Sequence, residues 1–236
     1  MTGTRASAFV TLTSSQQTLL KWFAIALMLL DHANRTLWVF QSWAFALGRI
    51  AFPLFAFLIA YNITVRGVRP GRYVLPLLVF GLISQIPAML ALGRGVLPLN
   101  IFFTLLLGVG LLRLRQWLLA FLPGGWMGAL LSRFLVCYLL LLFGIIVEFG
   151  PSGALLIPTM MLYLQRSRWL TGILAAFCLI MINGVHLASV TALLAAPVIY
   201  AVSRLKLPDL PRLKWFTYVF YPLHLSILWL LDKTLG

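Results

Sequence analysis

Residues 19–40 read LLKWFAIALMLLDHANRTLWVF, an apolar stretch long enough to cross a bilayer as a helix, yet it contains Asp31 and His32. Ionisable side chains are costly inside a bilayer, and those that occur there usually face a bundle interior or a water-filled cavity. We therefore interpret Asp31 and His32 as the centre of a buried functional site, and we expect the rest of the chain to enclose them.

The composition of the whole chain agrees with a membrane protein. Its 236 residues are 62% hydrophobic and only 9% charged, and apolar runs of about 20 residues recur along it. We predict one membrane-embedded, all-α domain comprising residues 1–236. The first apolar run leads into Asp-His rather than small residues, so no cleavable signal peptide is expected. Cys137 and Cys178 lack metal-ligand spacing and are expected to be buried thiols, and no metal site is predicted.

The hydrophobic pattern predicts nine transmembrane helices. Pro-Gly-Gly at 123–125 opens the one longer connection, and Trp117 and Trp126 flank it, which favours a short helix in the membrane interface. Two of the nine, 97–113 and 151–165, are short enough to be half-spans. The expected ranges are 18–39, 43–65, 73–92, 97–113, 132–149, 151–165, 168–184, 186–203 and 215–233.

The basic residues indicate an orientation. The formal net charge is +14, and the arginines and lysines occur in small groups between apolar runs, with little beyond Arg94 and Lys233 on one side of a nine-helix chain. The positive-inside rule places the basic side and the N-terminus in the cytoplasm and the C-terminus outside. Such scattered charge argues against nucleic acid as a partner and favours membrane lipid or an anionic cofactor. The groups are Arg5 and Lys21; Arg66, Arg69 and Arg72; Arg113, Arg115 and Arg133; Arg166 and Arg168; and Arg204, Lys206, Arg212 and Lys214.

Polar residues on separate helices share one depth. At about 1.5 Å of rise per helical residue, His32 lies beyond the bilayer midplane, in the outer half. Convergence of ionisable groups from distant helices predicts one common site. The other members of this depth band are Arg49, Asn100, Glu148, His186 and His224.

Asp31 and His32 cannot form a simple dyad, because neighbouring residues on a helix point about 100° apart. Asp31 can pair with Arg35, four residues later, or with Arg49 from the next helix. His32 needs an orienting group from elsewhere, and the candidates are Glu148 and His224.

Five segments, taken in order and spacing, resemble the TraX family, whose namesake is the F-pilin acetylase. They are LKWFAIALMLLDH at 20–32, GRIAFPLFAFL at 48–58, LISQIP at 82–87, NIFFTLLLG at 100–108 and FYPLHL at 220–225. The segment EFGPSG at 148–153 is similar to an acid-aromatic-Gly-x-x-Gly pattern, in which the family often has Asp and Tyr. Glu148 and Phe149 are departures from that pattern.

The resemblance implies an N-acetyltransferase of the bacterial inner membrane that moves acetyl from cytoplasmic acetyl-CoA to a pilin N-terminus. His32 would act as general base or carry the acetyl group itself, and Arg49 or Asn100 would stabilise the oxyanion. The expected catalytic residues are Asp31, His32, Arg49, Glu148 and His224. Those expected at the substrate are Asn100, Thr104, Tyr221 and Arg35, and those expected at the phosphates of acetyl-CoA are Arg66, Arg69, Arg72, Arg166 and Arg168.

Three alternatives remain open on the sequence. A transporter or channel would use the same buried Asp, His and Arg, although the chain lacks the internal repeat that many transporters carry. An acyltransferase acting on a surface glycan would differ only in its acceptor. A non-catalytic partner in pilus assembly would need neither Asp31 nor His32 beyond folding.

Overall fold

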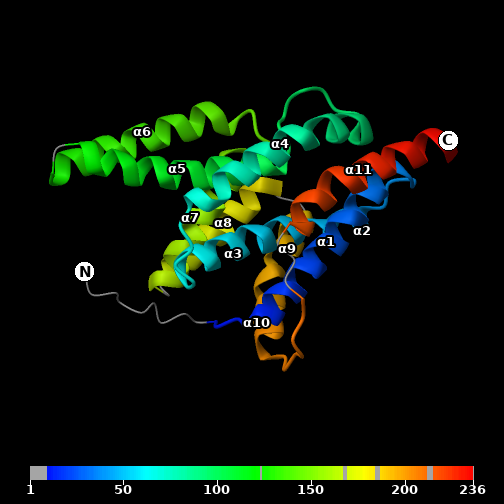
Figure 1. The fold of residues 1–236 in the computed structure, drawn as a ribbon, viewed down its shortest axis with the longest axis horizontal. Helices are drawn as coiled ribbons and strands as arrows, with labels where there is room; N and C mark the ends of the chain where they lie inside the picture. Colours follow the sequence, from blue (N-terminus) through cyan, green and yellow to red (C-terminus); the bar gives the residue numbers. More distant parts are fainter. Residues whose placement is uncertain (1–9, 123, 167–168, 184–186, 212–214, 236) are drawn as a thin grey trace.

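The computed structural model describes residues 10–122, 124–166, 169–183, 187–211 and 215–235. Across these residues the chain is helical (Figure 1), and its only β-type pairing is an isolated bridge between Leu99 and Val147. The helices are α1 (Ser14–Thr36), α2 (Ser42–Gly48), α3 (Ala51–Thr64), α4 (Gly71–Leu92), α5 (Ile101–Phe121), α6 (Trp126–Gly144), α7 (Gly150–Arg166), α8 (Trp169–Asn183), α9 (Leu187–Leu193), α10 (Ala195–Arg204) and α11 (Phe216–Leu235).

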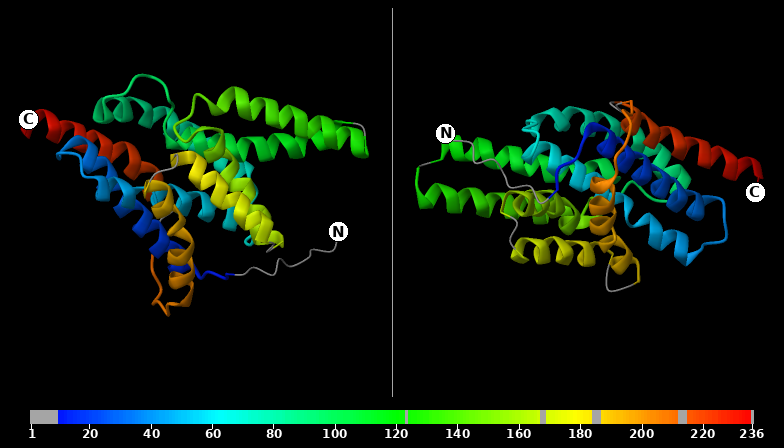
Figure 2. Two further views of the ribbon diagram at one scale, coloured as in Figure 1. Left: turned by 180° about the vertical axis from the view of Figure 1, so that it is seen from behind. Right: turned by 90° about the horizontal axis from the view of Figure 1, so that it is seen from below.

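The described segments form nine helical rods, which confirms the predicted number of helices, and four of them are long and apolar enough to be candidate membrane spans. Only Arg49 and Ile50 separate α2 from α3, and only Leu194 separates α9 from α10. Among the four candidate spans the α2–α3 rod is the most enclosed, with 78% of its most apolar window buried against 39% for α5 and 22% for α4 and for α6. It packs against α1 and α7, while α11 packs against α1 and α4 (Figures 1 and 2).

Local signals in the sequence set the ends of the helices that carry the site. α1 begins at a capping box, in which the Thr13 side chain accepts from Gln16 N–H and the Gln16 side chain accepts from Thr13 N–H. α4 ends at Gly93, whose φ of +59° is a left-handed conformation that suits glycine. Asn100 caps α5 by accepting from Phe102 N–H.

One end of the bundle collects the basic residues. Arg66, just after α3, donates to Ser14 at the start of α1, and Gln16 donates to the carbonyls of Ser203 and Leu205 at the end of α10. The Arg113 side chain lies beside the start of α4, where a Cβ on Gly71 would be 3.9 Å from its Nε. We call this the basic end, defined by Arg66, Arg69, Arg72, Arg113 and Arg204.

Four helices of the described chain are long and apolar enough to cross a membrane by length and composition: Ser42–Thr64, Gly71–Leu92, Ile101–Phe121 and Trp126–Gly144. Large apolar side chains on their outer faces, such as Leu75 and Phe134, are exposed, which suits contact with lipid. Which end of the bundle faces the cytoplasm stays a prediction.

Three expectations near α5 and α6 are corrected. The helix expected at 97–113 is not a half-span, because it runs on as α5 to Phe121. Trp117 lies within α5 and Trp126 begins α6, so no separate interfacial helix joins them, and these two helices form a hairpin that projects from the bundle (Figures 1 and 2). Both cysteines are free, but Cys137, on α6, is exposed rather than buried.

Candidate functional site

Asp31 is the electrostatic centre of the end opposite the basic end. Arg35, one turn later on α1, places Nη2 3.1 Å from Asp31 Oδ2, and Nη2 of Arg49 from the α2–α3 junction binds the same oxygen. Both predicted pairings are therefore present together. A Cβ on Gly48 would lie 2.9 Å from Asp31 Cγ, so glycine allows α2 to approach α1 this closely.

His32 is oriented by His224 on α11. His32 Nδ1 lies 2.7 Å from His224 Nε2, and His224 Nδ1 lies 2.7 Å from the carbonyl oxygen of Phe220. A carbonyl only accepts hydrogen bonds, so in the neutral pair His224 carries its hydrogen on Nδ1 and accepts at Nε2. His32 must then donate from Nδ1. This chain of hydrogen bonds leaves the unprotonated nitrogen of His32, Nε2, as the free base.

A small chamber lies beside this histidine pair. Its volume is about 30 Å³, room for about two water-sized groups. Arg49 Nε is buried without a hydrogen-bond partner among the described residues, and Arg49 lines the chamber. The side chains around it come from α1, the α2–α3 rod, α5, α11 and the α6–α7 connection: Met28, Asp31, His32, Gly48, Arg49, Ala51, Phe52, Ile101, Glu148, Phe149 and Tyr221.

Glu148 enters the chamber from the α6–α7 connection. Its N–H donates to the Leu99 carbonyl over 2.8 Å, and its Oε1 lies 2.8 Å from Nη1 of Arg94. Burial of Arg94 opposes its charge, but the neighbouring Glu148 carboxylate outweighs this and raises the pKa of Arg94 above its ordinary value. Of the two candidates for orienting His32, His224 therefore forms the hydrogen bond, whereas Glu148 forms an ion pair with Arg94.

Of the other residues expected to contact the substrate, some line the chamber and some do not. Tyr221 lines the chamber, with its ring centroid 5.8 Å from that of His32. Asn100 does not: its amide donates to the Gly81 carbonyl over 2.8 Å while its oxygen caps α5. Thr104 accepts from Phe149 N–H at 3.3 Å and lies behind the chamber wall. We assign structural roles to Asn100 and Thr104.

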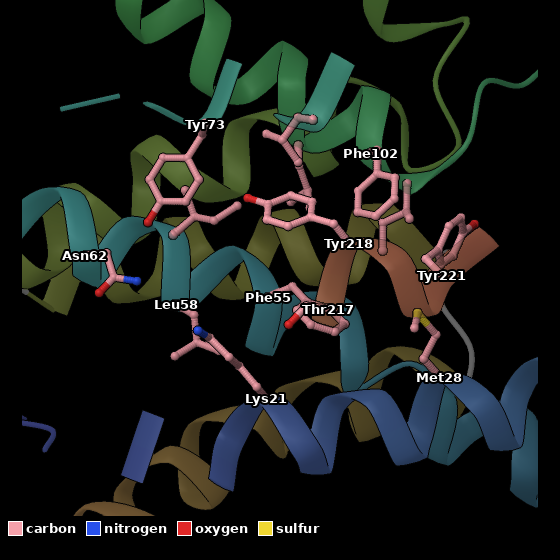
Figure 3. A pocket seen from close by; sticks show the side chains of 14 residues that line it. Lys21, Met28, Phe55, Leu58, Asn62, Tyr73, Phe102, Thr217, Tyr218 and Tyr221 are labelled. Atoms are coloured by element: carbon pink, nitrogen blue, oxygen red, sulfur yellow. The ribbon is translucent and has the colours of Figure 1, made fainter. Parts of the chain in front are cut away.

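A second, larger cavity lies next to the chamber, on the side of the basic end, and Figure 3 shows its lining. Its volume is about 180 Å³, and Met28, Ile101 and Tyr221 line both spaces. It is mostly apolar, but Lys21 and Asn62 line it as well (Figure 3). We call it the long cavity.

The arginines expected at acetyl-CoA do not gather at one place. Arg66 and Arg72 are exposed and lie close in sequence to Asn62 and Tyr73, which line the long cavity, and Arg69 is exposed between them. Arg166 ends α7, whose last turn lines a different apolar cavity through Tyr163 and Leu164. Arg168 and His186 lie outside the described residues.

From the sequence, Lys21 and Arg94 were expected only as charges that set the orientation, and their places beside the long cavity and Glu148 were missed. The sequence did single out Arg94, because it is one of the few basic residues on the side of the predicted bundle opposite the basic groups. Its partner Glu148 lies far away in sequence, so no helix spacing could pair the two. Among the described residues no three of His, Cys, Asp and Glu come together as metal ligands.

A bundle of long apolar helices around an enclosed cluster of ionisable side chains defines a helical membrane protein with a buried polar site. The family described as TraX protein matches residues 16–232. The chain belongs to the TraX family.

Individual relatives agree. A Protein TraX of Escherichia coli is 30% identical over 238 aligned residues, which cover 96% of this chain and 91% of the relative. A Protein TraX of Escherichia coli strain K12 is 51% identical over 49 residues, only 21% of this chain and 20% of that relative. No solved structure matches the chain.

Proposed function

We propose that the protein is an acetyltransferase of the bacterial inner membrane that moves acetyl from acetyl-CoA to the N-terminal amine of a pilin subunit during conjugative pilus maturation. The observation that carries the proposal is the free Nε2 of His32, fixed by His224 in a chamber that shares wall residues with the long cavity. Membership of the TraX family, with its F-pilin precedent, supports the choice of acceptor.

His32 serves as the general base. The acceptor arrives as an ammonium and must lose a proton before its nitrogen lone pair can attack. Its nitrogen then attacks the thioester carbonyl carbon, a C–N bond forms, and the C–S bond breaks. Of the two protons that the ammonium gives up, one leaves through His32 Nε2 and the other protonates the departing thiolate. His224 accepts from His32 Nδ1 throughout and keeps Nε2 aimed at the chamber.

Arg49 is the better of the two predicted oxyanion groups. Asn100 lies outside the chamber, whereas Arg49 lines it with an unpartnered Nε. The surroundings of the chamber also favour negative charge, because Arg49 in its wall and the nearby Arg35 and Arg94 together meet only two carboxylates, Asp31 and Glu148. A tetrahedral oxyanion is therefore stabilised at the moment it forms.

The long cavity suits the donor. A pantetheine arm is long and thin and carries two amides, and the cavity, whose mostly apolar lining includes Asn62 and Tyr73, reaches from Lys21 to the chamber wall at Tyr221 (Figure 3). From Lys21 to His32 along α1 the rise is about 16 Å. The phosphates would remain near Arg66 and Arg72 at the basic end, where a guanidinium can bind them in bidentate fashion. The chamber itself is too small for a long acyl chain.

The test is the intact mass of a pilin subunit co-produced with the wild-type protein or with His32→Ala. We expect the pilin to gain the mass of one acetyl group with the wild-type protein, and to gain nothing with the variant despite equal amounts in the membrane. Peptide mapping should place the acetyl group on the N-terminal amine. Full acetylation by His32→Ala would remove His32 from the mechanism, and no acetylation by the wild-type protein would overturn the proposed function.

A further inference from the structure

Glu148 borders two spaces. On one side it lines the chamber beside His32. On the other it lines an open hollow of about 530 Å³, formed by the α6–α7 connection, the residues before α5 and the end of α8. Phe149 also lines both, so the two side chains form the partition between the hollow and the chamber.

The partner of Glu148 is replaceable. Arg94 stands on the short connection after Gly93 rather than in a helix, and its side chain is 21% exposed against 14% for Glu148. Both side chains are mostly buried, so breaking the pair outright would be costly. A second cation that reaches Glu148 through the hollow avoids this cost, because the carboxylate stays paired while Arg94, on its short connection, turns towards water.

We propose that Glu148 is the recognition site for the acceptor ammonium, which enters through the hollow and takes the place of Arg94. The inference rests on the proposed function and names its acceptor class, an unblocked primary amine at a chain end. The donor reaches His32 from the long cavity, and the acceptor reaches it from the opposite side. The ammonium gives up its proton to His32 only after passing Glu148.

The exchange is selective because only a cation can replace Arg94 and still balance the negative charge of Glu148. An ammonium that displaces Arg94 leaves Glu148 paired, whereas a neutral hydroxyl would leave the carboxylate partly buried without a counter-charge. The same site therefore accepts an amine and rejects a sugar or alcohol hydroxyl. An amine that already carries an acetyl group is neutral and is rejected as well.

The first measurement is steady-state acetyl transfer by the purified full-length protein in detergent, with n-butylamine and n-butanol as matched acceptors. We expect transfer to the amine alone. Glu148→Gln should raise the KM for the amine about tenfold or more, as loss of a charged hydrogen bond predicts, and leave the KM for acetyl-CoA unchanged. Glu148→Asp should recover part of the loss, and Arg94→Gln should lower the amine KM. Asp209→Asn, exposed and remote, is the matched control.

The second measurement needs no turnover. Binding of a synthetic hexapeptide with a free N-terminus is compared with binding of its N-acetylated form. We expect only the free form to bind the wild-type protein, and Glu148→Gln to lose that binding. Equal binding of the two peptides, binding unchanged by Glu148→Gln, or efficient transfer to n-butanol would overturn the inference. Absence of any acetyl transfer would overturn the proposed function instead, while the peptide comparison still decides whether Glu148 recognises ammonium.

Discussion

At the residue scale, a single buried carboxylate holds two guanidinium groups. Asp31 binds Arg35 and Arg49 at once, and the rings of Phe45 and Phe149 cover Arg49 at 4.5 and 6.0 Å. The pair with Arg35 follows from helix spacing and could be read from the sequence. That Arg49 joins it rather than replacing Arg35 could not, because this depends on how closely α2 approaches α1.

The histidine pair gives a prediction at the same scale. His224→Phe removes the acceptor for His32 Nδ1 and frees the imidazole to take the wrong tautomer. We expect acetyl transfer to fall about a hundredfold or more, with little change in the KM for acetyl-CoA. His224→Gln keeps an acceptor oxygen and should retain more of the rate. Rates measured on equal amounts of purified protein check this, and equal loss in both variants would contradict it.

At the scale of elements, helix positions were predictable and several ends were not. The sequence predicted α4 at 73–92 and the structure has it at Gly71–Leu92. α5 exceeded its prediction because Arg113 and Arg115 were interpreted as lying beyond the membrane, yet a helix can continue past the bilayer. Composition shows where the apolar sequence ends, but the backbone hydrogen bonds of a helix can continue beyond that residue.

The contact between α5 and α7 gives an element-scale prediction. A Cβ on Gly108 would lie 2.6 Å from the backbone oxygen of Ala154, which cannot rotate away. We expect Gly108→Ala to destabilise the protein by about 1–3 kcal/mol. Gly110, on the same helix, has nothing within 4 Å of the same position, so Gly110→Ala is the matched control and should be neutral or slightly stabilising. Thermal inactivation in detergent measures both, and similar midpoints would show that this contact is not tight.

At the scale of the whole molecule, successive helices run in opposite directions, and this brings the helix ends that carry the polar residues to the same side of the bundle. The depth argument grouped Arg49, Glu148 and His224 near His32, and the structure places all four around or beside one chamber. Depth along a helix follows from counting residues. Lateral neighbours do not, which is why Asn100 was expected in the chamber and instead lies behind its wall.

The orientation in the membrane gives a prediction at this scale. The basic end should lie in the cytoplasm, because positively charged segments are retained there. Alkaline phosphatase fused after Gly236 should be active, and a green fluorescent protein at that position should be dark. The same reporters inserted after Lys206, at the basic end, should give the opposite pattern. Reversal at both positions would invert the topology and exclude entry of the donor from the cytoplasm.

The surplus guanidinium beside Asp31 and Glu148 has a consequence for the cell's electrochemical gradient. A route by which acetyl moves from one face of a membrane to the other also threatens to let protons and sodium ions flow through. The surplus positive charge along that route opposes free protons and sodium ions, as fixed positive charge does in pores that must exclude protons, while the acceptor ammonium of our proposal enters only by exchange with Arg94 at Glu148. The arrangement that we propose to stabilise an oxyanion would in this way also keep the bilayer electrically sealed during turnover.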